Sequence, residues 1–178
     1  SGEPLPKRQN ELAINGHAIE ARLYAEDPAR GFLPSTGRLE VLEFPSGARV
    51  ETGVEQGDAI TPYYDPMIAK LVTVGEERED AIRALADTVA SLRVWPVRTN
   101  AAFLHACLTH EDFRIGRLGT GFIAEREDAL VRVPEPTDAE WKAAALALFA
   151  PYFHSRDDSA PDPWRLALGF RLNEPDRG

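Results

Sequence analysis

The stretch GHAIEARLYAEDP, residues 16–28, decides the fold that we predict for this chain. Its middle alternates apolar and polar residues with a period of two, which predicts a β-strand with one buried face and one open face. The expected core face carries Ile19, Ala21 and Leu23, and the expected open face carries Ala18, Glu20, Arg22 and Tyr24. The acidic turn at Asp27 and Pro28 then ends the strand.

Arg22 is the candidate chemical centre of this strand. Glu20 precedes it by two residues and Tyr24 follows it by two, so all three side chains are expected on the open face. This arrangement is typical of an exposed ion pair between Arg22 and Glu20, which contributes little to stability. The strand pattern by itself favours the surface pair over a catalytic arginine.

Three further segments up to residue 75 have the composition of strands. RLEVLEF (38–44) and ARVETGV (48–54) are separated by the turn sequence PSG (45–47), and we predict that they form the two arms of a hairpin. MIAKLVTVG (67–75) is a longer apolar run, which predicts a strand covered on both faces.

The period then changes to that of a helix beginning near Glu76. Its expected inner face carries Ile82, Leu85, Val89 and Leu92. AAFLHACL (101–108) predicts a shorter helix capped by Thr99 or Asn100. The segment 110–125 is expected to make one helical turn and then run extended. These elements predict an α+β domain.

Composition narrows the class of protein. The chain has 178 residues, and 43% of them are hydrophobic, which is enough for a core. Lys and Arg number 20 against 29 Asp and Glu, giving a net charge of −9 that disfavours nucleic acid and anionic membranes as partners. A single cysteine, Cys107, and scattered histidines predict neither a disulfide nor a metal site. We therefore expect a cytosolic or matrix protein.

Two other motifs leave alternatives open. GTGF (119–122) lacks the spacing of a phosphate-binding loop, which favours a simple turn. In the loop TPYYDP (61–66), Tyr63 or Tyr64 could act as a general acid and Asp65 as a base. A rigid turn between two prolines explains that loop equally well.

Six motifs, in this order and spacing, resemble the biotin carboxylase C-terminal domain over residues 2 to about 126. They are GHAIEARLYAEDP, FLPSTGRL, YYDPMIAKLVTVG, EREDAIRAL, RTNAAFL and LGTGFI. DPWRLALGFRLN (162–173) resembles the first strand of the linker domain in long α subunits that act on 3-methylcrotonyl-CoA or propionyl-CoA. The resemblance implies an α+β fold of the rudiment single hybrid motif type, in which helices pack on one side of an antiparallel sheet.

The resemblance also implies a domain organisation. Residues 1–13 would connect to an absent ATP-grasp region, and 14–130 would form the biotin carboxylase C-terminal domain. Residues 131–163 would be a linker containing the alanine-rich helix DAEWKAAALALFA, and 164–178 the first strand of a truncated linker domain. On this interpretation the chain is a fragment that is inactive alone.

In the family, ATP activates bicarbonate and the ureido nitrogen of a protein-linked biotin is then carboxylated. The resemblance implies that Arg22 holds the ureido oxygen, that Phe122 packs near the adenine of ATP, and that Arg49 lies at a dimer interface. ATP and Mg²⁺ would be bound mainly by the ATP-grasp region, and biotin would be carried on a separate domain. This chain would bind no cofactor tightly.

The resemblance implies partners as well: the ATP-grasp region, a biotin carboxyl carrier domain and a carboxyltransferase β subunit, in an oligomer of the bacterial cytosol or, less favoured, the mitochondrial matrix. One alternative is a structural module that closes the ATP-grasp cleft and contacts subunits without chemistry of its own. Another is a different ATP-grasp enzyme, such as pyruvate carboxylase or urea carboxylase.

Overall fold

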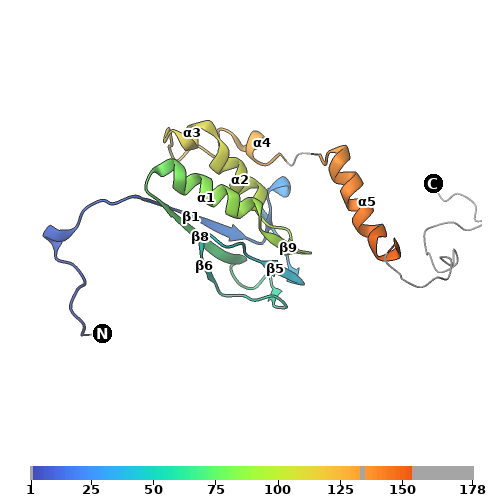
Figure 1. The fold of residues 1–178 in the computed structure, drawn as a ribbon, viewed down its shortest axis with the longest axis horizontal. Coiled ribbons are helices and arrows are strands. Elements are labelled where there is room, and N and C mark those ends of the chain that lie inside the picture. The colour runs from blue at the N-terminus through green and yellow to red at the C-terminus, as the bar shows by residue number, and fades with distance from the viewer. Residues whose placement is uncertain (1, 133–134, 154–178) are drawn as a thin grey trace, which may run out of the picture. The chain divides into compact units, whose positions relative to one another are not determined.

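The computed structural model describes residues 2–132 and 135–153. The chain divides into two compact units, Ser1–Val133 and Pro134–Gly178. In the first unit, helices cover one face of an antiparallel sheet, which confirms the predicted α+β class (Figure 1). The strand predicted within 164–178 lies outside the described residues, and the domain boundaries stay predictions.

The main sheet has the strand order β1-β8-β6, and both of its ladders are antiparallel. Its strands are β1 (His17–Tyr24), β8 (Met67–Gly75) and β6 (Arg49–Thr52). Three short ladders complete the strands of this unit: β2 (Glu26–Asp27) with β3 (Leu33–Pro34), β4 (Gly37–Arg38) with β7 (Ala59–Ile60), and β5 (Val41–Glu43) with β9 (Arg93–Trp95). The predicted faces of β1 are confirmed, because Ala21 and Leu23 are buried while Glu20 and Arg22 are exposed.

The hairpin predicted between 38–44 and 48–54 is wrong. β5 pairs with β9, about fifty residues further along the chain, and β6 pairs with β8. The long apolar strand β8 has two edges, of which β1 covers one. The other edge is open to β6, so the sheet satisfies the backbone of β6 without a local hairpin.

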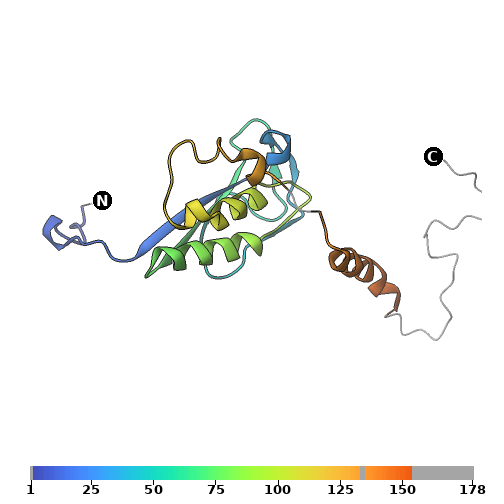
Figure 2. The same ribbon diagram turned by 90° about the horizontal axis from the view of Figure 1, so that it is seen from above.

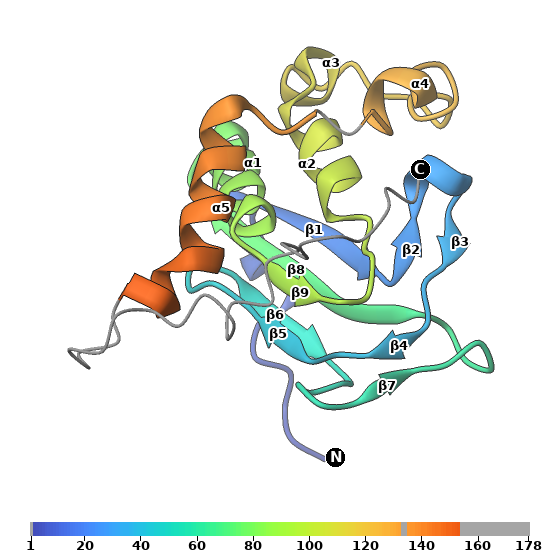
Figure 3. The ribbon, with the colours of Figure 1, turned by 90° about the vertical axis from the view of Figure 1, so that its right-hand side faces the viewer.

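The expectation that both faces of β8 are covered holds only in part. Ala69, Leu71 and Thr73 are buried on the helix side, whereas Val74 on the opposite face is 73% exposed. The reason is that the helices packed on this sheet, α1 (Arg78–Ala90) and α2 (Ala101–Thr109), lie on one face (Figures 2 and 3).

The main core lies between these two helices and the sheet. Leu23, Leu71 and Leu85 are fully buried there, and the predicted inner positions Ile82 and Val89 of α1 are buried beside them. The Thr73 hydroxyl donates a 2.7 Å hydrogen bond to the carbonyl of Ala81, which ties β8 to α1.

A second, smaller core lies among α2, α3 (Glu111–Arg114) and α4 (Glu127–Leu130). Its buried residues are Phe103, Cys107, Phe122 and Leu130. The single turn predicted after residue 110 is present as α3, but the predicted extended run is wrong, since turns lead from α3 into α4. The three glycines of this segment, at positions 116, 119 and 121, suit turns as well as extended backbone.

Three elements remain, the 3-10 helices η1 (Gln9–Glu11) and η2 (Pro28–Arg30), and α5 (Asp138–Phe153). The alanine-rich helix predicted from residue 138 is thus confirmed as α5, which lies in the second unit. Among the described residues, no helix combines the length and the apolar character that crossing a membrane requires.

Candidate active site

Arg22 stands on the open face of the main sheet, near the end of β1. Its side chain is 59% exposed, and its Nε donates a 3.2 Å hydrogen bond to Oε1 of Glu20. The pKa of the guanidinium is raised, first by Glu20 and then by the phenol of Tyr24. Arg22 is therefore a permanent cation, and the pair with Glu20 engages Nε rather than the two terminal amino groups.

The same face carries a row of charges across all three strands. Lys70 of β8 lies opposite Arg22 on one side and opposite Glu51 of β6 on the other. Residues that face each other across an antiparallel ladder point to the same side of the sheet. Glu51 forms ion pairs with both Lys70 and Arg49. Sequence reasoning overlooked Lys70 and Glu51, since only the strand register places Lys70 beside Arg22 and Glu51 beside Lys70.

Arg49, the predicted interface residue, lies on this open face as well. Its side chain is 74% exposed and pairs with Glu51. The structure thus brings Arg22 and Arg49 onto one face, from the two outer strands of the sheet. The role of Arg49 in an interface stays a prediction.

The backbone around Arg22 is held by Asn100, which is only 6% exposed. Its Oδ1 accepts a 2.9 Å hydrogen bond from the amide of Tyr24, and its Nδ2 donates a 3.2 Å bond to the carbonyl of Arg22. Asn100 does occupy the N-cap position of α2, but its side chain makes no capping bond. The sequence predicted a cap here, and the long-range bonds had no local signal.

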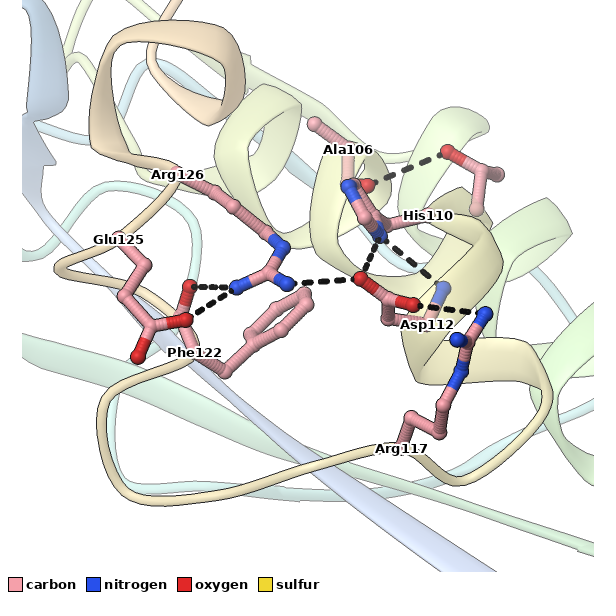
Figure 4. Close-up of polar contacts among 8 residues, drawn as sticks. Ala106, His110, Asp112, Arg117, Phe122, Glu125 and Arg126 are labelled. Carbon is pink, nitrogen blue, oxygen red and sulfur yellow. Dashed lines mark hydrogen bonds and ion pairs between the residues drawn. The ribbon is translucent and has the colours of Figure 1, made fainter.

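Phe122 lies in the second core rather than on the open face of the sheet. The residue is 8% exposed, its ring meets that of His110 edge to face at 5.3 Å, and the Arg126 guanidinium lies 5.1 Å above it (Figure 4). Its contact with adenine stays a prediction. The side chains of this chain already enclose the ring, so little of its face is left for a base.

Around Phe122, Asp112 links three surrounding residues. Its carboxylate accepts a 2.8 Å hydrogen bond from Nη2 of Arg126 and lies 3.3 Å from Nη2 of Arg117 (Figure 4). Its backbone amide donates a 3.1 Å hydrogen bond to Nδ1 of His110. The network holds the turns between α3 and α4 in place, which explains why these residues gather.

The TPYYDP loop leaves its candidate acid and base side chains accessible. Tyr63 and Tyr64 are 85% and 83% exposed. Asp65 lies close enough to Glu26 that its charge contributes, after desolvation, to raising the pKa of Glu26. Among residues 2–132 and 135–153, no three His, Cys, Asp or Glu side chains gather in a way that could hold a metal ion.

Comparison with known proteins assigns the chain to a family. A sequence profile described as "Biotin carboxylase C-terminal domain" matches residues 20–125. The chain belongs to the biotin carboxylase C-terminal domain family. The matched range includes Arg22, Arg49, Asn100 and Phe122, and it confirms the family resemblance carried by the sequence motifs.

Curated relatives of this biotin carboxylase C-terminal domain are α subunits of acyl-CoA carboxylases. The mitochondrial methylcrotonoyl-CoA carboxylase subunit alpha of Dictyostelium discoideum is 40% identical over 96% of the chain. The mitochondrial propionyl-CoA carboxylase alpha chain of Homo sapiens is 40% identical over 70% of it. The chain spans 25% and 18% of the length of these two relatives.

Solved structures agree with this assignment. The biotin carboxylase domain dimer of the 2-oxoglutarate carboxylase of Hydrogenobacter thermophilus, in complex with MgADP, ADP and bicarbonate, has a TM-score of 0.71 and 34% identity. The biotin carboxylase subunit of a pyruvate carboxylase has a TM-score of 0.70 and 34% identity. Each likeness covers 75% of this chain and 30% of the other chain, and both support the α+β fold class.

Proposed function

We propose that this domain forms one wall of the active site in which a biotin-dependent acyl-CoA carboxylase carboxylates biotin with ATP and bicarbonate. In this proposal Arg22 is the catalytic residue that the chain contributes. The observation that carries the proposal is the exposed, permanently charged guanidinium of Arg22 on the open sheet face of a biotin carboxylase C-terminal domain.

The chemistry of Arg22 suits the ureido group of biotin. When bound, that group supplies the nitrogen that accepts the carboxyl group. Arg22 would donate hydrogen bonds from its terminal amino groups to the ureido oxygen and so stabilise negative charge on that oxygen. A guanidinium stays protonated throughout, and a donor held in place stabilises charge that appears only in the transition state.

The chain fits the other cofactors less fully. The biotin carboxylase domain from Hydrogenobacter thermophilus was crystallised with MgADP and bicarbonate. In this chain, the described residues offer no cluster for a metal ion, and Phe122 is 8% exposed. We propose that ATP and Mg²⁺ are bound mainly by an ATP-grasp region and that biotin is carried on a separate domain.

The proposed partners follow from the same assignment. They are the ATP-grasp region of the same subunit, a biotin carboxyl carrier domain, and a carboxyltransferase β subunit in an oligomeric enzyme. The methylcrotonoyl-CoA and propionyl-CoA carboxylase relatives support an acyl-CoA carboxylase. We propose the bacterial cytosol as its location, with the mitochondrial matrix as the alternative because the names of several relatives describe them as mitochondrial.

One observation favours a second candidate function, that of a structural module without chemistry of its own. Arg22 forms a 3.2 Å pair with Glu20 and both side chains are exposed, as in ordinary surface ion pairs. In that case the open face would serve only as a surface for contact with the rest of the subunit.

Replacing Arg22 in the intact subunit separates the two functions. The measurement is bicarbonate-dependent ATP hydrolysis with free biotin for the parent, Arg22→Ala and Arg83→Ala. Arg83 is a matched control because it is also an exposed arginine, 64% accessible, and is paired with Asp80 on α1. We expect Arg22→Ala to lower kcat by a factor on the order of 10² to 10³ and Arg83→Ala to leave it unchanged.

Assembly of the two variants is checked by size-exclusion chromatography. A loss of activity in Arg22→Ala with parental assembly supports the catalytic function. Parental activity in Arg22→Ala would leave Arg22 as a surface ion pair and the domain as a structural module.

A further inference from the structure

Asn100 acts on β1 as a partner strand would. β1 lies at the edge of the main sheet, with β8 along one side. Along β1, the carbonyl of Arg22 and both backbone groups of Tyr24 bond to Asn100. The third of these bonds runs from the Asn100 amide to the Tyr24 carbonyl at 3.1 Å. One residue thus bonds three backbone groups of β1, beginning at the carbonyl of Arg22.

Helix capping does not account for Asn100. The side-chain oxygen of an N-cap asparagine ordinarily accepts a hydrogen bond from a backbone amide in the first turn of its own helix. Here the side chain makes no such bond, and the hydroxyl of Thr99 accepts the Ala101 amide at 3.4 Å instead. Both polar ends of the Asn100 side chain are used by β1, across 76 and 78 residues of sequence.

We infer that Asn100 is a positioning residue for Arg22: it clamps the backbone from the Arg22 carbonyl to Tyr24 and so sets where the guanidinium lies on the open face. This inference rests on the proposed catalytic function of Arg22. A guanidinium stands at the end of a long side chain, so a small shift of its backbone moves it further. Misplacement of a catalytic group by about 1 Å can cost on the order of 10²-fold in rate.

The test is a double-mutant cycle in the intact carboxylase subunit. Bicarbonate-dependent ATP hydrolysis with free biotin is measured for the parent, Asn100→Ala, Arg22→Ala and the double variant. Thr88→Val is the matched control, because its buried hydroxyl bonds only to the carbonyl of Ala84 within α1, at 2.8 Å. It removes a buried hydrogen bond that has no link to β1.

We expect Asn100→Ala to lower the biotin-dependent kcat by about 10-fold to 100-fold, with the KM for ATP unchanged. In the Arg22→Ala background the same change has no further effect, because residues that act through one another are not additive. Thr88→Val keeps the parental kcat. An equal fold-loss from Asn100→Ala in both backgrounds, or no loss in either, would overturn the inference.

A different result would overturn the proposed function, namely parental activity in Arg22→Ala alone.

A second measurement does not depend on catalysis. We expect faster hydrogen exchange at the Tyr24 amide in Asn100→Ala, with the Leu85 amide of α1 unaffected. Unchanged exchange at Tyr24 would overturn the clamp.

If Asn100→Ala fails to fold, Asn100→Ser replaces it in both measurements. Serine is a favoured N-cap and so maintains α2, whereas its short hydroxyl cannot bond both Tyr24 and Arg22. The same outcomes support or overturn the inference with this variant.

Discussion

Lys70 of β8 lies directly opposite Arg22 of β1 on the open face of the sheet. Like charges that face each other across an antiparallel ladder repel. Glu20 pairs with Arg22, and Glu51 pairs with Lys70. These two carboxylates offset the repulsion between Arg22 and Lys70, although Glu51 is shared with a third cation, Arg49.

The first prediction concerns Glu51, which offsets the charge of Lys70 and Arg49. We expect Glu51→Gln to lower the Tm. Added salt should reduce the Tm difference between the parent and the variant, because salt screens exposed charges. Thermal unfolding followed by circular dichroism at low and high salt measures both effects. Glu43→Gln is the control, since its carboxylate lies 3.6 Å from a single cation, Arg93. A larger loss of Tm in the control would contradict the prediction.

The stabilisation by Glu51 also depends on pH. Lys70 first, and then Arg49, lower the pKa of the Glu51 carboxyl below its ordinary value of 4.5. A carboxyl whose pKa is lower in the folded state stabilises the fold above its unfolded-state pKa, and this contribution is lost as pH falls through the folded-state value. The Tm difference between the parent and Glu51→Gln should therefore vanish in acid.

The second prediction has the opposite sign and concerns Glu26. Desolvation first, and then the charge of Asp65, raise the pKa of Glu26 above its ordinary value of 4.5. Ionisation of such a group favours the unfolded chain. The free energy of unfolding therefore falls as pH rises from the ordinary pKa of 4.5 through the raised pKa of the folded state. We expect Glu26→Gln to raise the Tm at neutral pH and to have no such effect at acidic pH. An equal shift of Tm at every pH would refute this.

The third prediction concerns Gly75, where β8 ends just before α1. An added Cβ at this position would lie 2.6 Å from the amide nitrogen of Ala81 and 2.8 Å from the carbonyl oxygen of Glu77. Gly75→Ala is expected to lower the free energy of unfolding by about 1–3 kcal/mol through overpacking. Gly53→Ala is the control, as its added Cβ meets nothing within 4 Å.

Urea unfolding of the two glycine variants measures the difference. Gly53→Ala should leave the free energy of unfolding unchanged or raise it slightly, because alanine restricts the unfolded chain. Equal destabilisation by both substitutions would show that the close approach of β8 and α1 is not the cause.

The fourth prediction concerns the thiol of Cys107, which is 8% exposed in the second core. Burial raises its pKa to about 11, so little thiolate is present at moderate pH. We expect a thiol-specific reagent to leave the native protein unmodified at mildly alkaline pH and to modify one cysteine after denaturation. Rapid labelling of the native protein would contradict both the burial and the raised pKa.

Local patterns in the sequence predicted much of the fold. The alternation of Ile19, Ala21 and Leu23 placed the core face of β1, and the helical spacing of Ile82, Leu85 and Val89 placed that of α1. Both predictions succeed because backbone geometry alone sets the direction of successive side chains. The motifs of residues 16–28 and 63–75 also indicated the family, which the match over residues 20–125 confirmed.

Strand partners could not be predicted in this way. The turn sequence PSG favours a local hairpin, yet β6 pairs with β8 and β5 with β9. Partner choice depends on which edges in the whole chain remain open, and a short window of sequence does not contain that information.

By itself the sequence determined the secondary-structure periods, the open face that carries Arg22, and the family. Only the tertiary structure decided what surrounds Arg22. The register placed Lys70 opposite it, and the packing of α2 brought Asn100 to its backbone. The physical reason is that these contacts join residues 48 and 78 positions apart, as the numbering shows, and their free energy exists only once the whole sheet and its helices have assembled.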